Sequence, residues 1–308
     1  MALTLVEAAK RNQNPIQSAV IEMFARNSDV LRVLPFNDIQ GNALRYNREE
    51  TLPGVGFRGI NEAYTESTGV INPITEPLVI AGGDLDVDMF ILDTMGMDQR
   101  SAQEEMKVKS LALAWTSQFI NGDSITDPRG FDGLFVRVTG NQLIDNSGAA
   151  AAALSLLNLD RLIDTVDNPT HLIMNKQMRR RLTVASRTAA VGGNITWEPD
   201  DFGRQIAKYN DLPILIADYD NNGTQIMQFN EPDIAATGPT VSTSIYCISV
   251  GTNMLTGIQN GGMDVRDLGE LQAQPAMRTR VEWYSGIACF HGRAIARLGS
   301  ISDAAVVA

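Results

Sequence analysis

The chain has 308 residues, enough for two domains or one large one, and its 44% apolar and 20% charged residues are typical of a protein with a substantial buried core. The 36 acidic residues outnumber the 25 basic ones, and the net charge of −11 at pH 7 argues against free binding to nucleic acid or to anionic membranes. We expect no signal peptide, and no apolar run approaches the roughly 20 residues of a membrane span.

The first 35 residues predict a helical segment in two pieces. Apolar side chains recur there at helical spacing, and Pro15 suits an early helical position. The segment is followed by a polar stretch with a different pattern.

Residues 40–90 form a polar arm in which apolar residues occur singly and no helical stripe develops. A structureless loop of this length is unusual inside a compact domain, so we interpret the arm as an extended hairpin that lies on a neighbouring subunit. Its returning strand is expected to carry apolar residues on one face and acids on the other. The apolar set is Ile80, Leu85, Val87 and Phe90, and the acids are Asp84, Asp86 and Asp88.

The longest predicted helix covers about residues 98–121, and Gly122 is placed to end it. Its expected apolar stripe consists of Ala102, Met106, Leu111 or Ala112, Trp115 and Phe119. Two further helices are expected at about 158–166 and 176–189, with a short buried strand at 171–174 before the second.

From residue 212 onward the chain predicts mostly strands. Three are expected at 212–218, 224–229 and 244–250, with turns at 222–223 and 238–239. The last two, 278–284 and 287–301, are expected to be separated by a break at Ser285–Gly286.

Gly54, Gly56 and Gly59 satisfy the spacing GxGxxG, which binds a dinucleotide when an apolar strand precedes it and a helix follows. Here Pro53 and a charged run precede the glycines, and a polar stretch follows. We therefore favour a flexible loop tip over a cofactor site.

Two acidic patterns could suggest metal binding. Asp218, Asp220 and Asn222 begin a calcium-loop pattern, but Phe229 stands where a bidentate Glu is required, so a tight hairpin turn is favoured and a structural ion stays open. The acids at 84, 86 and 88 predict a solvated or arginine-paired strand face rather than a metal site.

The two cysteines and two histidines lack the spacing of a zinc site, and no GxSxG motif is present. We therefore expect no catalytic, cofactor-binding or metal-binding residue. Cys247 and Cys289 both lie in apolar runs, which favours buried free thiols, with a disulfide as the alternative.

Between residues 171 and 195 the chain carries five basic residues and no acid. A solvated helix face is the simplest interpretation, contact with an acidic patch of an adjacent subunit is the second, and nucleic-acid contact is the third. The residues are Lys176, Arg179, Arg180, Arg181 and Arg187.

The order of these segments resembles the major capsid protein of tailed bacteriophages, an α+β protein with the Hong Kong 97-like (Johnson) fold. The resemblance covers nearly the whole chain. Four strings carry it in order: FINGD at 119–123 with GFDGL at 130–134, THLIMNKQMRRRL at 170–182, NDLPILIADY at 210–219, and VEWYSGIACFHGRAIARLGSI at 281–301.

The resemblance implies five segments. They are an N-terminal arm (1–39), an extended E-loop hairpin (40–92), a peripheral domain with a long spine helix (93–166), an axial domain (167–275) and the return strands of the peripheral domain (276–308). Some relatives carry a scaffolding segment ahead of the arm. Whether scaffold is a separate protein or a removed N-terminal segment stays open.

The resemblance also implies a non-enzymatic subunit that assembles with itself into the pentamers and hexamers of an icosahedral head in the host bacterial cytoplasm. The virion head would enclose double-stranded DNA without specific binding, and the partners would be a scaffolding protein, a portal and a decoration protein in some relatives. Some relatives are crosslinked through an E-loop lysine. This E-loop has none, so we expect non-covalent stabilisation.

The candidate functional residues are interface residues. On the E-loop, charged side chains could fix the register on a neighbour, and glycines would let the tip bend. The charged set is Arg45, Arg48, Glu49, Glu50 and Arg58 on the loop, together with Arg179, Arg180 and Arg181 on the axial-domain helix. The flexible set is Gly54, Gly56 and Gly59.

Two alternatives remain. An encapsulin-like nanocompartment shell would share the fold and enclose a cargo protein instead of DNA. A soluble α/β enzyme would instead form a small oligomer that binds nucleotide or metal at the glycine motif or the acidic turns.

Overall fold

The computed structural model describes residues 28–95, 98–148, 150–187, 195–199, 205–235 and 241–307; the side chains of residues 50, 95, 98 and 99 lie outside this description. The expected N-terminal helices fall mostly on residues 1–27, outside the described part. Helix α3 (Asp29–Val33) begins at Ser28, whose side chain accepts a hydrogen bond from the Leu31 amide.

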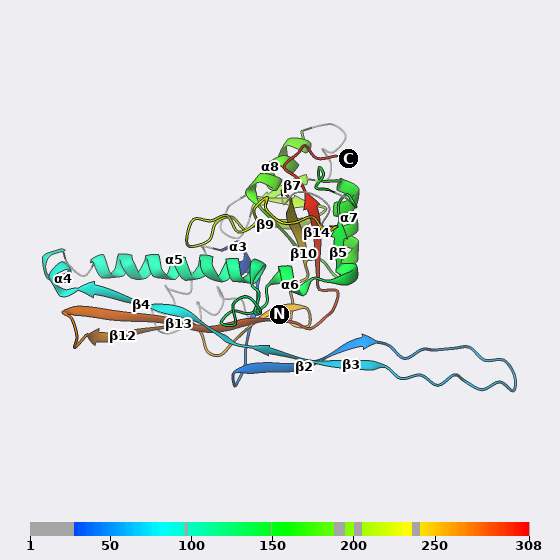
Figure 1. Ribbon diagram of the computed structural model, residues 1–308, viewed down its shortest axis with the longest axis horizontal. Coiled ribbons are helices and arrows are strands. Elements are labelled where there is room, and N and C mark those ends of the chain that lie inside the picture. The colour runs from blue at the N-terminus through cyan, green and yellow to red at the C-terminus, as the bar shows by residue number, and fades with distance from the viewer. Residues whose placement is uncertain are drawn as a thin grey trace.

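A long five-stranded sheet and one long helix form the elongated half of the molecule (Figure 1). The helix α5 (Asp98–Asn121) has the predicted bounds. Strand β13 (Ala276–Cys289) is central in the sheet and pairs antiparallel with β4 on one edge and with β11 and β12 on the other. The remaining strands are β1 (Phe36–Asp38), β4 (Val79–Asp88), β11 (Leu255–Gln259) and β12 (Asp264–Glu270).

Aromatic side chains join α5 to this sheet. The ring centroid of Phe36 lies 5.7 Å from that of Trp115 and 5.1 Å from that of Trp283. Trp115 on α5 also donates a hydrogen bond from Nε1 to Ser285 Oγ on β13, at 3.1 Å. Because all four side chains are buried, this cluster fixes the helix across the middle of the sheet.

The predicted stripe of α5 is right in its second half and wrong in its first. Trp115 and Phe119 are buried as expected, whereas Ala102 and Met106 are exposed. In the first half the buried face carries Arg100, whose guanidinium donates to Thr279 Oγ1 at 2.7 Å and pairs with Asp267 at 2.9 Å. A polar network therefore replaces apolar packing where the helix leaves the core.

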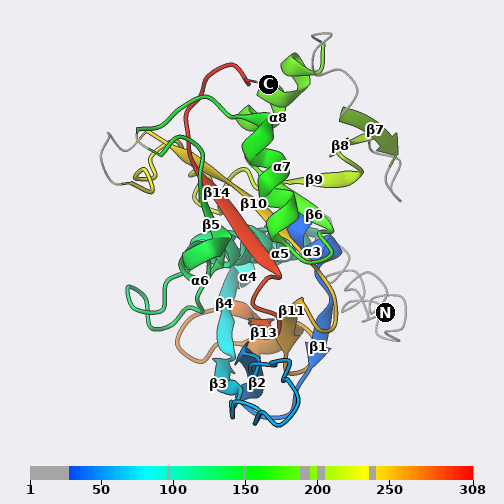
Figure 2. The ribbon, with the colours of Figure 1, turned by 90° about the vertical axis from the view of Figure 1, so that its right-hand side faces the viewer.

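The second half of the molecule is a seven-stranded sheet with the order β5-β14-β10-β6-β9-β8-β7, which lies above the hairpin in Figure 2. Its strands are β5 (Leu143–Asp145), β6 (His171–Met174), β7 (Ile195–Pro199), β8 (Gln205–Tyr209), β9 (Leu212–Ile216), β10 (Thr243–Ile248) and β14 (Ile295–Ile301). Helices α7 (Leu156–Thr165) and α8 (Lys176–Ala185) add buried leucines to its core.

Strands β2 (Ala43–Thr51) and β3 (Val70–Pro77) form a separate antiparallel hairpin that projects from the body (Figure 1). An extended hairpin was predicted for the polar arm, but its returning strand is β3, and the predicted returning strand, β4, pairs with β13 in the five-stranded sheet. The connection from β4 to α5 contains α4 (Met89–Met95), so Phe90 lies in a helix and not in the returning strand. Ile80 is also on the opposite face from the one predicted, because it is exposed together with the acids of β4.

Several strand predictions need correction. Residues 224–229 form no strand and make one bridge, between Gln225 and Tyr219. Strand β13 continues through Ser285–Gly286, and the chain instead turns at residues 290–294. The helix predicted at 176–189 ends at Ala185, and the turn predicted at 238–239 lies outside the described residues.

Strand pairing also divides the chain differently from the expected segments. Strands β11 and β12, expected in the axial domain, belong to the five-stranded sheet. Strands β5 and β14, expected in the peripheral domain, belong to the seven-stranded sheet, where β14 pairs with β10 and β5. The chain therefore crosses between the two sheets at residues 290–294, a connection that hydrophobic patterning alone does not reveal.

Candidate intersubunit surfaces

The tip of the hairpin, residues 52–69, exposes large apolar side chains. Their exposed fractions range from 69% to 105%, with Phe57 fully accessible. Clustered apolar side chains of this kind mark an interaction surface in a soluble protein. The set is Leu52, Val55, Phe57, Ile60 and Tyr64.

The glycines of the tip do not occupy the turn. The chain reverses at Ile60–Asn61, where Asn61 has φ +64°, whereas Gly54, Gly56 and Gly59 have no left-handed φ. The Gly59 amide donates to Glu62 Oε2 at 2.8 Å, which ties one glycine to the turn. Neither an apolar strand directly before the glycines nor a helix after them is present within residues 43–77, so the context of a dinucleotide site is missing.

The charged residues expected on the E-loop separate onto two faces of the hairpin. Along β2, Arg45 and Glu49 are exposed, while Tyr46 and Arg48 point toward the body and are partly buried. Near the tip, Arg58 donates to the Glu62 carbonyl at 3.2 Å and its guanidinium lies 5.2 Å from the centroid of the Tyr64 ring. The side chain of Glu50 lies outside the described residues.

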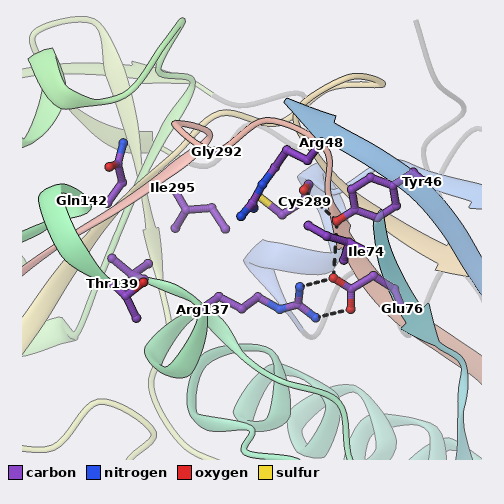
Figure 3. Close-up of a pocket in the computed structure, with 11 residues that line it drawn as sticks. Tyr46, Arg48, Ile74, Glu76, Arg137, Thr139, Gln142, Cys289, Gly292 and Ile295 are labelled. Atoms are coloured by element: carbon purple, nitrogen blue, oxygen red, sulfur yellow. Dashed lines mark hydrogen bonds and ion pairs between the residues drawn. The ribbon is translucent and has the colours of Figure 1, made fainter. Parts of the chain in front are cut away.

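The base of the hairpin is fixed by a buried ion pair that the sequence did not indicate (Figure 3). Arg137, at the end of helix α6 (Leu134–Arg137), donates to both carboxylate oxygens of Glu76, at 2.5 and 2.7 Å. Tyr46 donates to the Cys289 carbonyl at 2.8 Å, and its ring centroid lies 4.7 Å from that of Phe290. These contacts join β2 and β3 to two other parts of the chain.

Burial shapes the electrostatics of this site. Desolvation, with the neighbouring charge of Glu76, raises the pKa of Tyr46 to about 12, so its hydroxyl stays protonated. Burial also raises the pKa of the Cys289 thiol. Burial opposes the charge on Arg137, but the hydrogen bonds and charge of Glu76 outweigh that effect and raise the pKa of Arg137.

Two of the three aspartates of the series on β4 are paired with arginines, one of the two interpretations drawn from its spacing, whereas Asp88 accepts a hydrogen bond from the Phe90 amide at 2.8 Å. Asp84 accepts from Arg280 at 2.6 and 2.9 Å, and Asp86 accepts from Arg278 at 2.6 and 2.7 Å. The register of β4 on β13 places each pair directly opposite one another. This ladder covers the outer face of the sheet, opposite α5.

Replacing both Asp84 and Asp86 with asparagine should flatten the acid limb of the stability–pH curve. Hydrogen bonds from Arg280 and Arg278 hold the pKa values of these carboxyls below their usual 3.8. Their contribution is complete above the unfolded-state pKa and is lost as pH falls through the lower folded-state pKa. Urea denaturation from neutral pH down to about pH 2 measures this difference. Identical pH dependence in both proteins would contradict the assignment.

The basic run on α8 is partly neutralised within the chain. Arg181 pairs with Asp303 at 2.8 Å, and Lys176 pairs with Asp218. Arg180 is exposed and Arg179 is partly buried on the same helix. Arg179 and Arg180 therefore remain available as interface candidates, whereas Arg181 already has an acidic partner in its own subunit.

The acidic turn at 218–223 is explained without an ion. Asp220 Oδ1 accepts from the amides of Asn222 and Thr224, at 2.8 and 2.7 Å, and Gly223 has φ +77°. No group of three or more potential metal-ligating side chains occurs in the described part of the chain. Both cysteines are free and buried, and burial raises the pKa of Cys247 to about 12. Among the described helices, none is long and apolar enough to cross a membrane.

No protein-family model and no curated protein sequence matches the chain. Its structure, however, is similar to solved shells over most of its length. The holo-SrpI encapsulin complex from Synechococcus elongatus PCC 7942 superposes with a TM-score of 0.66 and 16% identity, covering 91% of this chain and 89% of that one. The capsid of an empty GTA particle superposes with a TM-score of 0.61 and 16% identity, and the match covers 90% of each chain. The structure from Mycobacterium phage Adephagia superposes with a TM-score of 0.62 and 11% identity, and the match covers 88% of this chain and 89% of that one.

These similarities, together with the long helix, the two sheets and the projecting hairpin, define the class of fold: the chain has the Hong Kong 97-like α+β fold. The projecting hairpin covers residues 43–77, the long helix is α5, and the second sheet has seven strands.

Proposed function

We propose that the protein is the major coat subunit of an icosahedral phage head, a structural protein without catalytic activity. The observation that carries the proposal is the hairpin, which projects from the body with an apolar tip that its own subunit leaves uncovered. A second copy would cover it, since identical subunits in a closed shell present the same acceptor surface to every hairpin. In this proposal the subunits assemble into the shell through pentamers and hexamers.

The same proposal assigns the contents of the head. A net charge of −11 on each subunit suits a container for DNA, because a wall that bound its contents would oppose packaging and release. The subunit would assemble in the host bacterial cytoplasm with a scaffolding protein and a portal and would end in the virion. Similarity to the GTA capsid and to phage structures supports this assignment.

An encapsulin-like compartment is the second candidate, and similarity to the SrpI encapsulin favours it. The two candidates differ in what the shell encloses. Particles from recombinant cells that hold nucleic acid, or that package it when a portal is supplied, would support the phage head. Particles that co-purify with one cargo protein and hold no nucleic acid would support the compartment.

Purified recombinant protein is expected to form closed particles, or rings of five and six subunits, because each hairpin needs a neighbour. Light scattering with negative-stain imaging measures this directly. A protein that stays monomeric or dimeric, with and without scaffolding protein, would contradict the shell assignment and would justify a test of nucleotide binding.

A further inference from the structure

A cavity of about 280 Å³ lies at the base of the hairpin (Figure 3). Three parts of the chain line it: strands β2 and β3, the segment from α6 to Gln142, and the turn between β13 and β14. The Arg48 side chain extends from β2 past Cys289 into this space. The hydroxyl of Thr139 and the amide of Gln142 also border it.

Among the described residues that line the cavity, one positive charge has no acidic partner. Glu76 and Arg137 neutralise each other through two hydrogen bonds, and Arg137 Nε donates to the Asp132 carbonyl at 2.6 Å. The two other titratable groups at the cavity, Tyr46 and Cys289, have raised pKa values and are uncharged at neutral pH. Among the described residues that line the cavity, the remaining charge is that of Arg48.

Arg48 is held in this position by the strand. Because side chains alternate along β2, Arg48 shares the inward face with Tyr46, which is anchored to the Cys289 carbonyl. The Arg48 residue is partly buried, and no carboxylate within the described residues pairs with it. A guanidinium is suited to bind a carboxylate through two parallel hydrogen bonds.

We propose that this cavity is a contact site for a second copy of the chain, in which a carboxylate of the neighbouring subunit pairs with Arg48. The excess of 36 acidic over 25 basic residues favours a carboxylate of a second copy as the partner of Arg48. Thr139 and Gln142, across the cavity from Arg48 in Figure 3, carry further hydrogen-bond donors. The inference rests on the proposed shell function and names one of its contacts.

The site predicts different effects for the removal of two arginine charges. Arg48→Gln removes the charge in the cavity, whereas Arg129→Gln removes an equal charge from the exposed turn after α5. Assembly of purified subunits, followed by light scattering against protein concentration, is expected to need about tenfold more Arg48→Gln protein than wild type, as for the loss of one charge-assisted hydrogen-bonded pair. Arg129→Gln is expected to assemble as wild type does.

A cryo-electron-microscopy map of the wild-type shell provides an independent test that needs no variant. A carboxylate of a neighbouring copy beside Arg48 would support the proposal. Solvent, a carboxylate of the same chain, or phosphate at that position would overturn it. Circular dichroism and urea denaturation check that Arg48→Gln is folded; if it is not, Arg48→Lys and the map decide.

The outcomes separate this inference from the shell proposal. If wild type assembles and Arg48→Gln assembles equally well, the shell function stands and the contact site is wrong. If Arg48→Gln assembles normally but its particles hold less nucleic acid, Arg48 contacts phosphate and the contact site is again wrong. If wild type fails to assemble under any condition, the shell function itself fails.

Discussion

Replacing Phe57 and Ile60 together with serine should abolish shell assembly while leaving the subunit as stable as wild type. Both side chains are almost fully exposed, so the isolated subunit gains nothing from them. If a neighbour buries them, each contributes about 1.5–3 kcal/mol to the contact. Their combined loss would weaken association at least about a hundredfold for every hairpin. Light scattering measures assembly, and urea denaturation measures the free energy of unfolding.

The matched control is Ile125→Ser, because Ile125 is 87% exposed but lies in the turn after α5 and not on the hairpin. It is expected to assemble normally. If the hairpin variant forms particles at the wild-type concentration, the tip is not an assembly contact. A large fall in its free energy of unfolding would show instead that the tip packs within its own subunit.

Trp283→Ala should cost about 3–5 kcal/mol of unfolding free energy, the range for truncating a large aromatic side chain in a packed core. Trp283 is 1% exposed, packs against Phe36 and Trp115, and donates from Nε1 to Gln259 Oε1 at 3.1 Å. The substitution therefore opens a cavity and leaves the Gln259 side chain without this donor. A loss of this size approaches the whole stability of many domains, so little folded protein is expected at 37 °C.

Tyr284→Ala is the control on the same strand. Tyr284 is 37% exposed and faces away from α5, where it pairs across the strands with Ile80. Its replacement is expected to cost well under half as much, because exposed positions contribute little to the core. Equal losses from both variants, measured by urea denaturation, would mean that the aromatic cluster does not organise the fold.

Much of the architecture could be predicted from the sequence where the signal is local. The bounds of α5 and β6 follow from periodicity and from their bordering residues, and the hairpin follows from a polar stretch that has no core of its own. The alternation of acids on β4 also predicted one of its observed roles, the arginine-paired face. In each case the pattern is set by neighbours within one turn or one strand, so sequence order carries the information.

Some sequence signals marked residues that matter in the structure, but the predicted role of those residues was wrong. Gly286 suggested a break in the last strands, but it allows a close approach: a side chain there would lie 2.9 Å from the Pro77 carbonyl oxygen. The first half of α5 was expected to continue the apolar stripe, yet its buried face carries Arg100, which Thr279 and Asp267 satisfy from two strands near the other end of the chain. Such partners are invisible to a local pattern.

By itself, the sequence determined the order of elements, the long helix, the projecting arm and the acidic balance of the protein. Only the tertiary structure decided which strands share a sheet, that Glu76 meets Arg137 from 61 residues away, and that Arg45 and Arg48 face opposite sides of one strand beside different surroundings. The reason is physical: periodicity follows from the geometry of a single element, whereas burial, ion pairing and cavities depend on which elements come together when the core forms.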